Sequence, residues 1–406
     1  MKNLSILLIL LAFSCSTALE ESNVSSILSP AKEKAGEPAF FQISETNLGL
    51  SWVETEGDNA VLKYAVYENN NWAAPKTVAQ GNDWFVNWAD FPAMQVTGED
   101  GNIFHAHFLK KSSPETFSYN IMVTTSTDGG NNWEIPIQIH GDTIEGEHGF
   151  LSFFPMANLH TGAVWLDGRE STGSMDHGGD SGHSTGAMTL RFGEIDQTGK
   201  KIREERLDER ICDCCQTSAV SLNGKALAVY RNRTEEEIRD IWMVRFDGEN
   251  WSSPEKFSED NWEIAGCPVN GPSIDASGNQ VAVAWFTGAG GIMKVKLKIS
   301  NDEGKTFGSE ILVNDGNPAG RVDLVFLEEE NIAVSWIETS GEEDFLRLKV
   351  FDKMGQTLYS HNLTPISSSR KSGFPRMISA GENQLIFAWT DIETNSIRTA
   401  AIKLDL

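Results

Sequence analysis

A short apolar run that carries one large aromatic residue and then ends in polar residues recurs seven times along this chain. The aromatics follow one another at intervals of roughly 50 to 65 residues, near the upper end of the periods known for repeat proteins. A nearly constant period of this size indicates that each unit is one supersecondary element packed against its neighbours. The seven aromatics are Trp52, Phe108, Trp165, Tyr230, Trp285, Trp336 and Trp389.

Each aromatic run is preceded by another apolar stretch and followed by a second run that ends in a turn rich in Asn, Asp and Gly. Val, Ile, Tyr and Phe alternate with polar residues in these second runs, which predicts strands rather than helices. Four strands in each repeated unit is the pattern of a β-propeller. The sequence therefore predicts an all-β fold, a seven-bladed β-propeller of four-stranded blades. The clearest second runs are Tyr64–Tyr67, Ile121–Thr125, Ile241–Phe246 and Lys294–Ile299.

The first 15 residues have the composition of an export signal. Lys2 precedes an apolar run, Leu4–Phe13, that is too short to span a bilayer. The stretch Ala12–Cys15 resembles a bacterial lipobox, with Cys15 as the lipid-carrying first residue of the mature chain; an ordinary signal peptide cleaved slightly later is the alternative. We therefore expect a lipoprotein signal peptide over 1–15 and an exported lipoprotein of the bacterial outer membrane, periplasmic or on the cell surface.

The rest of the chain is expected to form one domain. We expect residues 16–35 to form a polar tether and residues 36–406 to form a single propeller. The seventh unit ends after its third strand, and Val24–Leu28 has the composition of a strand. That segment could therefore complete the last blade and close the ring.

The charge of the chain limits its partners. The formal net charge is −25, from 33 Lys and Arg against 58 Asp and Glu. No cluster of Lys or Arg offers the basic stripe that a phosphate backbone requires, so we expect no nucleic-acid partner. We expect a monomer that meets the membrane only through the lipid on Cys15.

A ligand site is predicted on one face of the ring. In a propeller the first strand of each blade lines the central axis, so residues just before it and just after the second strand share a face. Acids and arginines that meet in one concavity suit a polar ligand. The candidates are Asp90, Arg169, Arg231, Arg321, Asp323 and Arg376.

Three of these arginines form a sharper prediction. Asp167-Gly168-Arg169 ends a second strand, and Arg321 and Arg376 open the first strands of the last two units. Guanidinium groups bind carboxylates through paired, charge-assisted hydrogen bonds. We therefore predict that Arg169, Arg321 and Arg376 face one pocket and bind a carboxylate or a similar anion.

The cysteines form a second unusual group. Cys212, Cys214 and Cys215 precede the fourth unit, and Cys267 precedes the fifth, so adjacent blades would bring them together. Two disulfides are the favoured interpretation for an exported protein with four such thiols. A metal site is the alternative, since soft sulfur ligands suit copper(I) or zinc.

Histidines offer a weaker metal hypothesis. The segment Asp176–His183 is a Gly-rich loop with two His and two Asp residues, for which a solvated loop is the favoured interpretation. His105 and His107 alternate on one strand and share a face, and we expect them to be hydrogen-bonded core residues.

Two turns, Ser126–Trp133 and Ser300–Phe307, share the pattern Ser-x-Asp-x-Gly-x-x-aromatic. This pattern resembles the Asp box, or BNR repeat, of the sialidase superfamily, which joins the third and fourth strands of a blade on the face away from the active site. The boxes therefore argue for the fold and carry no catalytic residue. Further stretches resemble a group of exported bacterial propellers described as sialidase-like, namely Glu147–Phe150, Trp165–Arg169, Cys212–Thr217 and Gly266–Pro272.

The resemblance implies a chemistry. Sialidases hydrolyse terminal sialic acids with three arginines on the sugar carboxylate, a Tyr assisted by Glu as nucleophile and an Asp as acid/base, a role that Asp90 would take here. The family's propeller has six blades, which is the alternative to seven, and its Arg-Ile-Pro motif has no counterpart at Glu37-Pro38. Tyr230 aligns with the tryptophans of other units, so we expect it to pack rather than react.

Two hypotheses for function follow. The first is a glycoside hydrolase, or a related carbohydrate-active protein, acting on acidic, sialic-acid-like glycans through the Arg- and Asp-rich face. The second is a non-catalytic glycan-binding or metal-handling surface lipoprotein built on the same ring.

Overall fold

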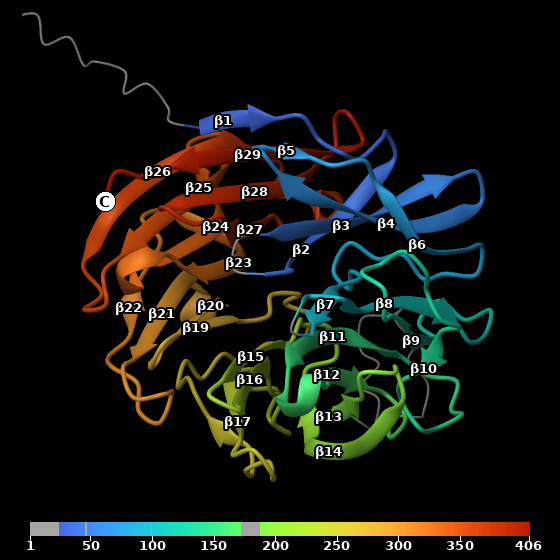
Figure 1. Ribbon diagram of the computed structural model, residues 1–406. Helices are drawn as coiled ribbons and strands as arrows, with labels where there is room; N and C mark the ends of the chain where they lie inside the picture. The colour runs from blue at the N-terminus through green and yellow to red at the C-terminus, as the bar shows by residue number, and fades with distance from the viewer. Residues whose placement is uncertain (1–23, 45–46, 99, 172–186) are drawn as a thin grey trace, which may run out of the picture.

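Strands that follow one another along the chain pair antiparallel in groups, and the groups are arranged as a ring around one axis (Figure 1). The computed structural model describes residues 24–44, 47–98, 100–171 and 187–406. Within these ranges there are seven sheets. The predicted seven-bladed β-propeller is therefore confirmed, and the six-bladed alternative is wrong.

In the first four blades the strands follow chain order from the axis outward. They are β2 (Ala35–Gln42), β3 (Leu48–Glu56), β4 (Asn59–Glu68) and β5 (Asn71–Trp72) with β6 (Lys76–Gly81); β7 (Met94–Thr97), β8 (Ile103–Lys111), β9 (Tyr119–Ser126) and β10 (Ile137–Gln138); β11 (His148–Pro155), β12 (Thr161–Asp167), β13 (Met188–Ile195) and β14 (Lys201–Ile211); and β15 (Ser218–Leu222), β16 (Lys225–Arg231), β17 (Ile241–Phe246) and β18 (Glu255–Lys256).

The last three blades are built in the same way, except that the outermost strand of the seventh comes from the other end of the chain. They are β19 (Ser273–Ser277), β20 (Gln280–Thr287), β21 (Lys294–Ser300) and β22 (Ile311–Leu312); β23 (Asn317–Phe326), β24 (Ile332–Ser340), β25 (Glu343–Phe351) and β26 (Thr357–Pro365); and β27 (Arg376–Ser379), β28 (Gln384–Asp391), β29 (Ser396–Lys403) and β1 (Val24–Ile27). No helix in the described ranges has both the length and the apolar character needed to span a bilayer.

Blade one departs from four strands because its outer edge is divided. Both β5 and β6 pair with β4, at opposite ends of that strand. Pro75 lies between them and has no backbone N–H to donate to the ladder, so pairing is interrupted there.

The ring is closed by strands from opposite ends of the described chain. β1 is the outermost strand of the last blade and pairs antiparallel with β29, with Val24 opposite Ile402 and Ile27 opposite Thr399. Figure 1 shows this contact as blue β1 beside red β29. The closure removes an open edge that would otherwise expose a row of unpaired backbone groups.

The aromatic of each second strand lies between blades, and all seven are at least half-buried. Three of the tryptophans donate their indole N–H to a carboxylate two residues later, on the same face of the strand, at distances of 2.8, 2.8 and 2.9 Å. A cation pairs with each carboxylate, from the adjacent strand for Glu54 and Glu338 and from Arg169, two residues later, for Asp167. These acids therefore serve the packing of the repeat; they are Glu54 beside Trp52, Asp167 beside Trp165 and Glu338 beside Trp336.

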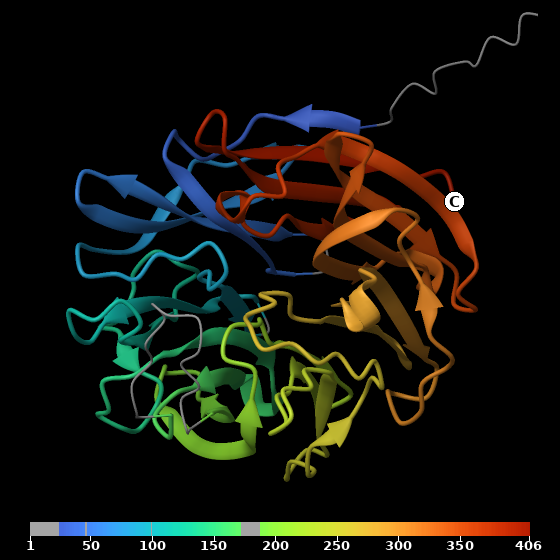
Figure 2. The same ribbon diagram turned by 180° about the vertical axis from the view of Figure 1, so that it is seen from behind.

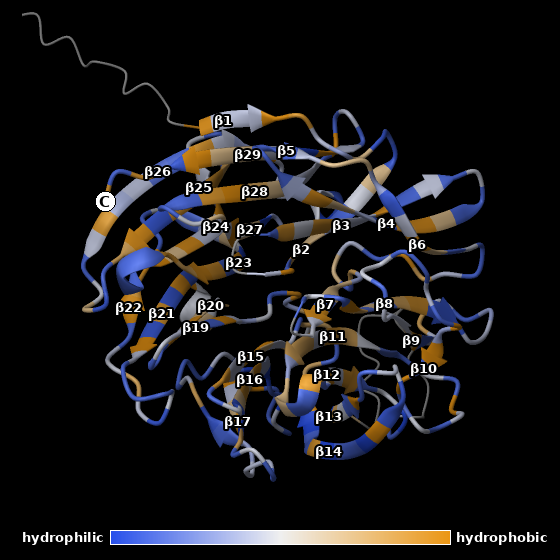
Figure 3. Ribbon diagram, in the orientation of Figure 1, coloured by the Kyte–Doolittle hydropathy of each residue, from blue (hydrophilic) through white to orange (hydrophobic). Residues whose placement is uncertain are grey.

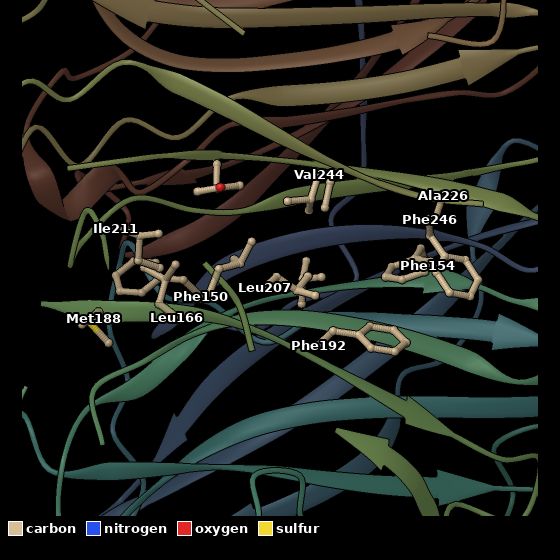
Figure 4. Close-up of a cluster of buried hydrophobic side chains, with 14 of the residues drawn as sticks. Phe150, Phe154, Leu166, Met188, Phe192, Leu207, Ile211, Ala226, Val244 and Phe246 are labelled. Atoms are coloured by element: carbon tan, nitrogen blue, oxygen red, sulfur yellow. The ribbon is translucent and has the colours of Figure 1, made fainter. Parts of the chain in front are cut away.

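Apolar side chains between adjacent sheets form the core. Between blades three and four, Phe154 and Phe192 pack against Phe246, together with Leu166 and Val244 (Figure 4). Figure 3 shows apolar residues concentrated on the strands, whereas the outer strand β14 is largely hydrophilic. The core therefore runs around the ring between blades and leaves the axis to be lined by other residues.

Both Asp boxes join the third and fourth strands of their blades, as predicted. In the first box, the Asp128 carboxylate accepts bonds from Ser126 Oγ at 2.8 Å and from the Asn132 N–H at 2.9 Å, and Gly130 adopts a φ of 76°. These hydrogen bonds hold the pKa of Asp128 well below its usual range. The box contacts the loop between the first and second strands through Gly129. It therefore lies at the end of the blade opposite the loops that lead into the first strands.

Candidate functional site

A cavity of about 1080 Å³ follows the axis of the ring. It is lined by residues from the first strands of all seven blades and from the loops that lead into them. Figure 2 looks onto the face that carries these loops. The charged residues of the lining include Asp90, Asp275, Asp323 and Arg376.

Asp90 belongs to a buried group that joins blades two and three. Its Oδ1 accepts the backbone N–H of Phe150 at 2.7 Å, and its Oδ2 lies 3.4 Å from the hydroxyl of Tyr119. The same hydroxyl donates to Glu147 Oε1 at 2.7 Å. One phenol therefore connects two carboxyl groups; we call Asp90, Tyr119 and Glu147 the acid–tyrosine cluster.

Burial changes the proton affinity of this cluster. It raises the pKa of Asp90 to about 7 and that of Glu147 to about 8, although the Tyr119 hydroxyl favours the charged form of each. Burial also raises the pKa of Tyr119, which the two carboxyl groups raise further. At neutral pH the cluster therefore holds protons that exposed carboxylates would have lost, as an acid/base group requires.

The cluster fits because residue 149 has no side chain. A Cβ on Gly149 would lie 1.8 Å from Asp90 Oδ2 and 3.1 Å from the ring of Tyr119. Phe85 stacks on the ring of Tyr119, with ring centroids 4.2 Å apart. Because Tyr119 is fully covered, only Asp90 of the three lines the cavity.

Arg376 is the arginine that reaches the cavity. Its side chain is 31% exposed, pairs with Asp323 Oδ1 at 3.2 Å and lies over the ring of Phe91 at 5.6 Å. Asp323 is itself buried and accepts the N–H of Met377 at 2.8 Å. Arg376 and Asp323 thus form an ion pair at the cavity.

Arg169 lies elsewhere. Its guanidinium bonds Asp167 at 2.7 Å through both Nε and Nη2, and it also contacts Glu204 of the outer strand β14 and Asp142. These acids raise its pKa further above the usual range. Arg169 does not line the cavity, because three carboxylates hold it toward the outside of blade three.

Arg231 and Arg321 also donate their hydrogen bonds to groups within the protein rather than to the cavity. Arg231 is 1% exposed, donates to the carbonyls of Asn270, Arg239 and Phe286, and stacks over Trp262 at 4.9 Å. Arg321 donates to Ser372 Oγ and to the carbonyls of residues 368 and 369, and burial lowers its pKa to about 10. The prediction that Arg169, Arg321 and Arg376 share one pocket is therefore wrong.

The four cysteines outside residues 1–15 do meet, as predicted, but as free thiols. Cys212 Sγ lies 3.9 Å from Cys214 Sγ and 3.6 Å from Cys215 Sγ, and Cys267 contacts Cys214. The favoured pair of disulfides is thus not formed. Arg239 Nη1 donates to Cys212 Sγ at 3.3 Å, and the neighbouring thiols and this cation hold the pKa of Cys212 well below its usual range.

The cysteine loops adjoin the acid–tyrosine cluster. Gln216 donates to the carbonyl of Ala89 at 2.5 Å and accepts the N–H of Gly271 at 3.2 Å. It therefore connects the loops that carry Asp90, the first three cysteines and Cys267. The negative charges of Asp213 and Cys267 contribute to the raised pKa of Glu147, which places all three near one another.

Within the described residues, the histidines are not arranged to share one metal ion. His105 and His107 are buried, and each has one ring nitrogen in a hydrogen bond, with Thr125 and the backbone of Ala93 respectively; burial lowers the pKa of each to about 4. His140 and His148 approach Asp142, but their rings stack in parallel with centroids 3.7 Å apart. Lone pairs in parallel, stacked rings cannot point at one ion. The loop Asp176–His183 lies outside the described residues.

Sequence reasoning missed Tyr119 and Asp275 and did not assign Glu147 a role. Tyr119 is the first residue of a third strand, directly after the loop that follows the second strand, and it was not considered because only residues next to the first and second strands were searched. Asp275 sits inside a first strand and accepts the N–H of Phe326 at 2.8 Å. An acid at an inward position of an axial strand was the available signal. Tyr230 packs in the core and donates to Asp208 at 2.6 Å, as expected of a packing residue.

Comparison with known proteins adds a family and a fold. A family model described as "BNR repeat-like domain" matches residues 53–385. A search of curated proteins found no match.

Three solved structures show similar folds. They are an α-L-arabinanase of Penicillium chrysogenum complexed with arabinobiose (11% identity, 94% of this chain and 97% of that chain, TM-score 0.51), an α-L-arabinofuranosidase of Fusarium graminearum in complex with an iminosugar inhibitor (12%, 94% and 97%, 0.51), and the polysaccharide lyase Uly1 (10%, 91% and 90%, 0.54). At these identities the likeness concerns the fold alone.

Proposed function

Because the chain belongs to the family of BNR repeat-like domains, we propose that it is a carbohydrate-active enzyme, a glycoside hydrolase that binds its substrate in the axial cavity. The observation that carries the proposal is Asp90, a buried carboxyl group with a pKa of about 7 that lines this cavity. Propellers of similar fold act on arabinan-type or other polysaccharides, which supports a glycan as the ligand class.

Asp90 is the proposed acid/base. A carboxyl group that is still protonated near neutral pH can donate a proton to the leaving oxygen of a glycosidic bond and later accept one from water. Glu147 and Tyr119 do not line the cavity, so they are positioning residues. They hold Asp90 in place and, through the shared hydroxyl, adjust its proton affinity.

Arg376 suggests the substrate class. Three carboxyl groups of the cavity are buried, and burial raises the pKa of each. Arg376 is the partly exposed cation among them, and a guanidinium binds a sugar carboxylate through a charge-assisted bond. We therefore extend the proposal to acidic, sialic-acid-like glycans, held by one arginine rather than three.

The catalytic proposal is tested with a panel of acidic and neutral glycans, by chromatography of released sugars. We expect turnover by the unchanged protein, and a loss of about a hundred-fold or more in kcat/KM for Asp90→Asn, since general acid–base catalysis contributes that much. Asp275→Asn is the matched control, because Asp275 also lines the cavity and accepts a backbone N–H but lies outside the acid–tyrosine cluster. Absence of turnover on the whole panel by folded protein, or full activity of Asp90→Asn, would refute the proposal.

The substrate class is tested by a pair of arginine replacements. Arg376→Lys keeps the positive charge but loses the paired N–H donors of the guanidinium. It should weaken binding of acidic sugars by roughly ten- to a hundred-fold, which is the effect of losing a charged hydrogen bond. Arg169→Lys should leave binding unchanged, because its guanidinium is held by Asp167 and Glu204. Calorimetric titration measures both. Equal affinities for acidic sugars in Arg376→Lys and the unchanged protein would limit the enzyme to neutral glycans.

A further inference from the structure

Two loops on the cavity face bring four thiols together. Cys212, Cys214 and Cys215 lie between β14 and β15, and Cys267 lies between β18 and β19. The sulfur atoms of the first three all lie within 4.8 Å of one another, and Cys267 contacts Cys214. Four sulfur ligands from two adjacent blades are thus present in one place, in a part of the molecule that the proposed hydrolysis does not use.

The sulfur spacing fits ligation of a single ion. In a tetrahedral zinc–thiolate site with Zn–S bonds near 2.3 Å, sulfur atoms are separated by about 3.8 Å. The two shortest separations, from Cys212 to Cys215 and to Cys214, are 3.6 and 3.9 Å. Disulfide bonding would instead require about 2.05 Å between two sulfurs. The cluster is therefore already close to the arrangement that an ion of this kind needs.

A buried cation beside the thiols, Arg239, favours a negatively charged set of ligands. Arg239 is buried, and its Nη1 donates to Cys212 Sγ at 3.3 Å. The guanidinium is held in that position by Glu237, which accepts from Nη2 at 2.8 Å. Hydrogen bonds from outer residues to ligand atoms orient metal ligands and stabilise their charge. Arg239 would also offset the excess negative charge of four thiolates around one cation.

The site is accessible from one side. Cys212 and Cys215 are buried, Cys214 is half-buried and Cys267 is exposed. An ion could therefore reach the buried sulfurs from solvent beside Cys267. Nitrogen and oxygen ligands are not needed, and an all-sulfur set selects thiophilic ions such as zinc(II) and copper(I).

We propose that Cys212, Cys214, Cys215 and Cys267 bind one thiophilic metal ion, zinc(II) or copper(I), and that this ion ties the loop before β15 to the loop before β19. The tie holds the loops beside the acid–tyrosine cluster. Its role is structural and does not depend on the hydrolysis of a glycan.

The test uses the full chain purified anaerobically, with a reductant and without chelator. Elemental analysis should find about one zinc or copper ion per chain. Because the two metals are measured separately, the result also identifies the ion. Cobalt(II) added to the apoprotein should give an intense sulfur-to-metal band and the visible absorption of a tetrahedral site. Chelation should lower the melting temperature of the loaded protein by several degrees.

Variants separate ligation from folding. Cys267→Ser changes an exposed residue, so it should fold, yet lose at least ten-fold in cobalt affinity. Ala265→Ser, which is also exposed and in the same loop, is the matched control and should bind as the unchanged protein does. The proposal fails if reduced, folded protein contains neither metal and gives no cobalt spectrum. It also fails if mass spectrometry finds two disulfides in anaerobically isolated protein, or if Cys267→Ser binds cobalt unchanged.

Discussion

Replacing Glu147 by glutamine should raise the free energy of unfolding at pH 9 by about 3–5 kcal/mol and leave it nearly unchanged near pH 4, since each pKa unit corresponds to 1.36 kcal/mol. Burial raises the pKa of Glu147 to about 8 in the folded chain, from 4.5 when it is exposed. Between these values the folded protein binds a proton that the unfolded chain has released. The contribution of Glu147 to the free energy of unfolding is therefore fully present below pH 4.5. It is lost as the pH rises from there through 8.

Glutamine removes that dependence, because it is neutral at every pH and its amide oxygen can still accept the Tyr119 hydroxyl. Denaturant titrations from pH 4 to pH 9 measure the difference between the two proteins, which cancels contributions from other groups. Glu145→Gln, two residues earlier and exposed, is the control and should follow the unchanged protein. A constant difference between Glu147→Gln and the unchanged protein across this range would show that Glu147 is charged in the fold.

Gly271→Ala should destabilise the protein by about 3 kcal/mol, at the upper end of the cost of overpacking a tight contact. A Cβ at this position would lie 2.2 Å from the carbonyl oxygen of Gln216 and 2.8 Å from its backbone carbon and nitrogen. Backbone cannot move aside as a side-chain tip can. The loops before β15 and β19 would have to separate, which would also part Cys267 from the other cysteines.

Thermal and denaturant unfolding measure this effect, with Gly266→Ala as the control. Gly266 lies in the same loop, and a Cβ there would meet only Ile264, at 3.9 Å. Its replacement should change stability by less than about 0.5 kcal/mol, as for an ordinary surface position. Equal stabilities of the two alanine variants would mean that the loops part without cost.

The repeat made the fold predictable, because its signals are local. An aromatic on every second strand and a turn after every third are visible in short windows of sequence. The divided edge of blade one was not predicted, since it depends on how two segments share β4. The pairing of β1 with β29 was predicted, because the seventh unit lacks a fourth strand and Val24–Leu28 has the composition of one.

The site was harder to predict, because the ion-pair partners of each side chain decide whether it can contact a ligand in the cavity. The sequence placed the cavity face at the right ends of the strands and brought the four cysteines together. It did not show that Asp142 and Glu204 would bind the guanidinium of Arg169. Nor did it show that Arg231 would donate its hydrogen bonds to backbone carbonyls. The acid–tyrosine cluster was missed because its hydrogen bonds cross from one blade to the next.

The pairing of β1 with β29 also fixes an order of events during synthesis. Among the strands that the structure describes, β1 emerges from the ribosome first and its partner β29 emerges last. At the usual rate of translation, roughly 20 to 80 seconds separate the two. Throughout that interval β1 remains an unpaired strand, and the growing stack of blades has no closing contact. Aggregation of the nascent chain should therefore depend on how long translation of the last blade takes, and slow codons there would prolong the exposure.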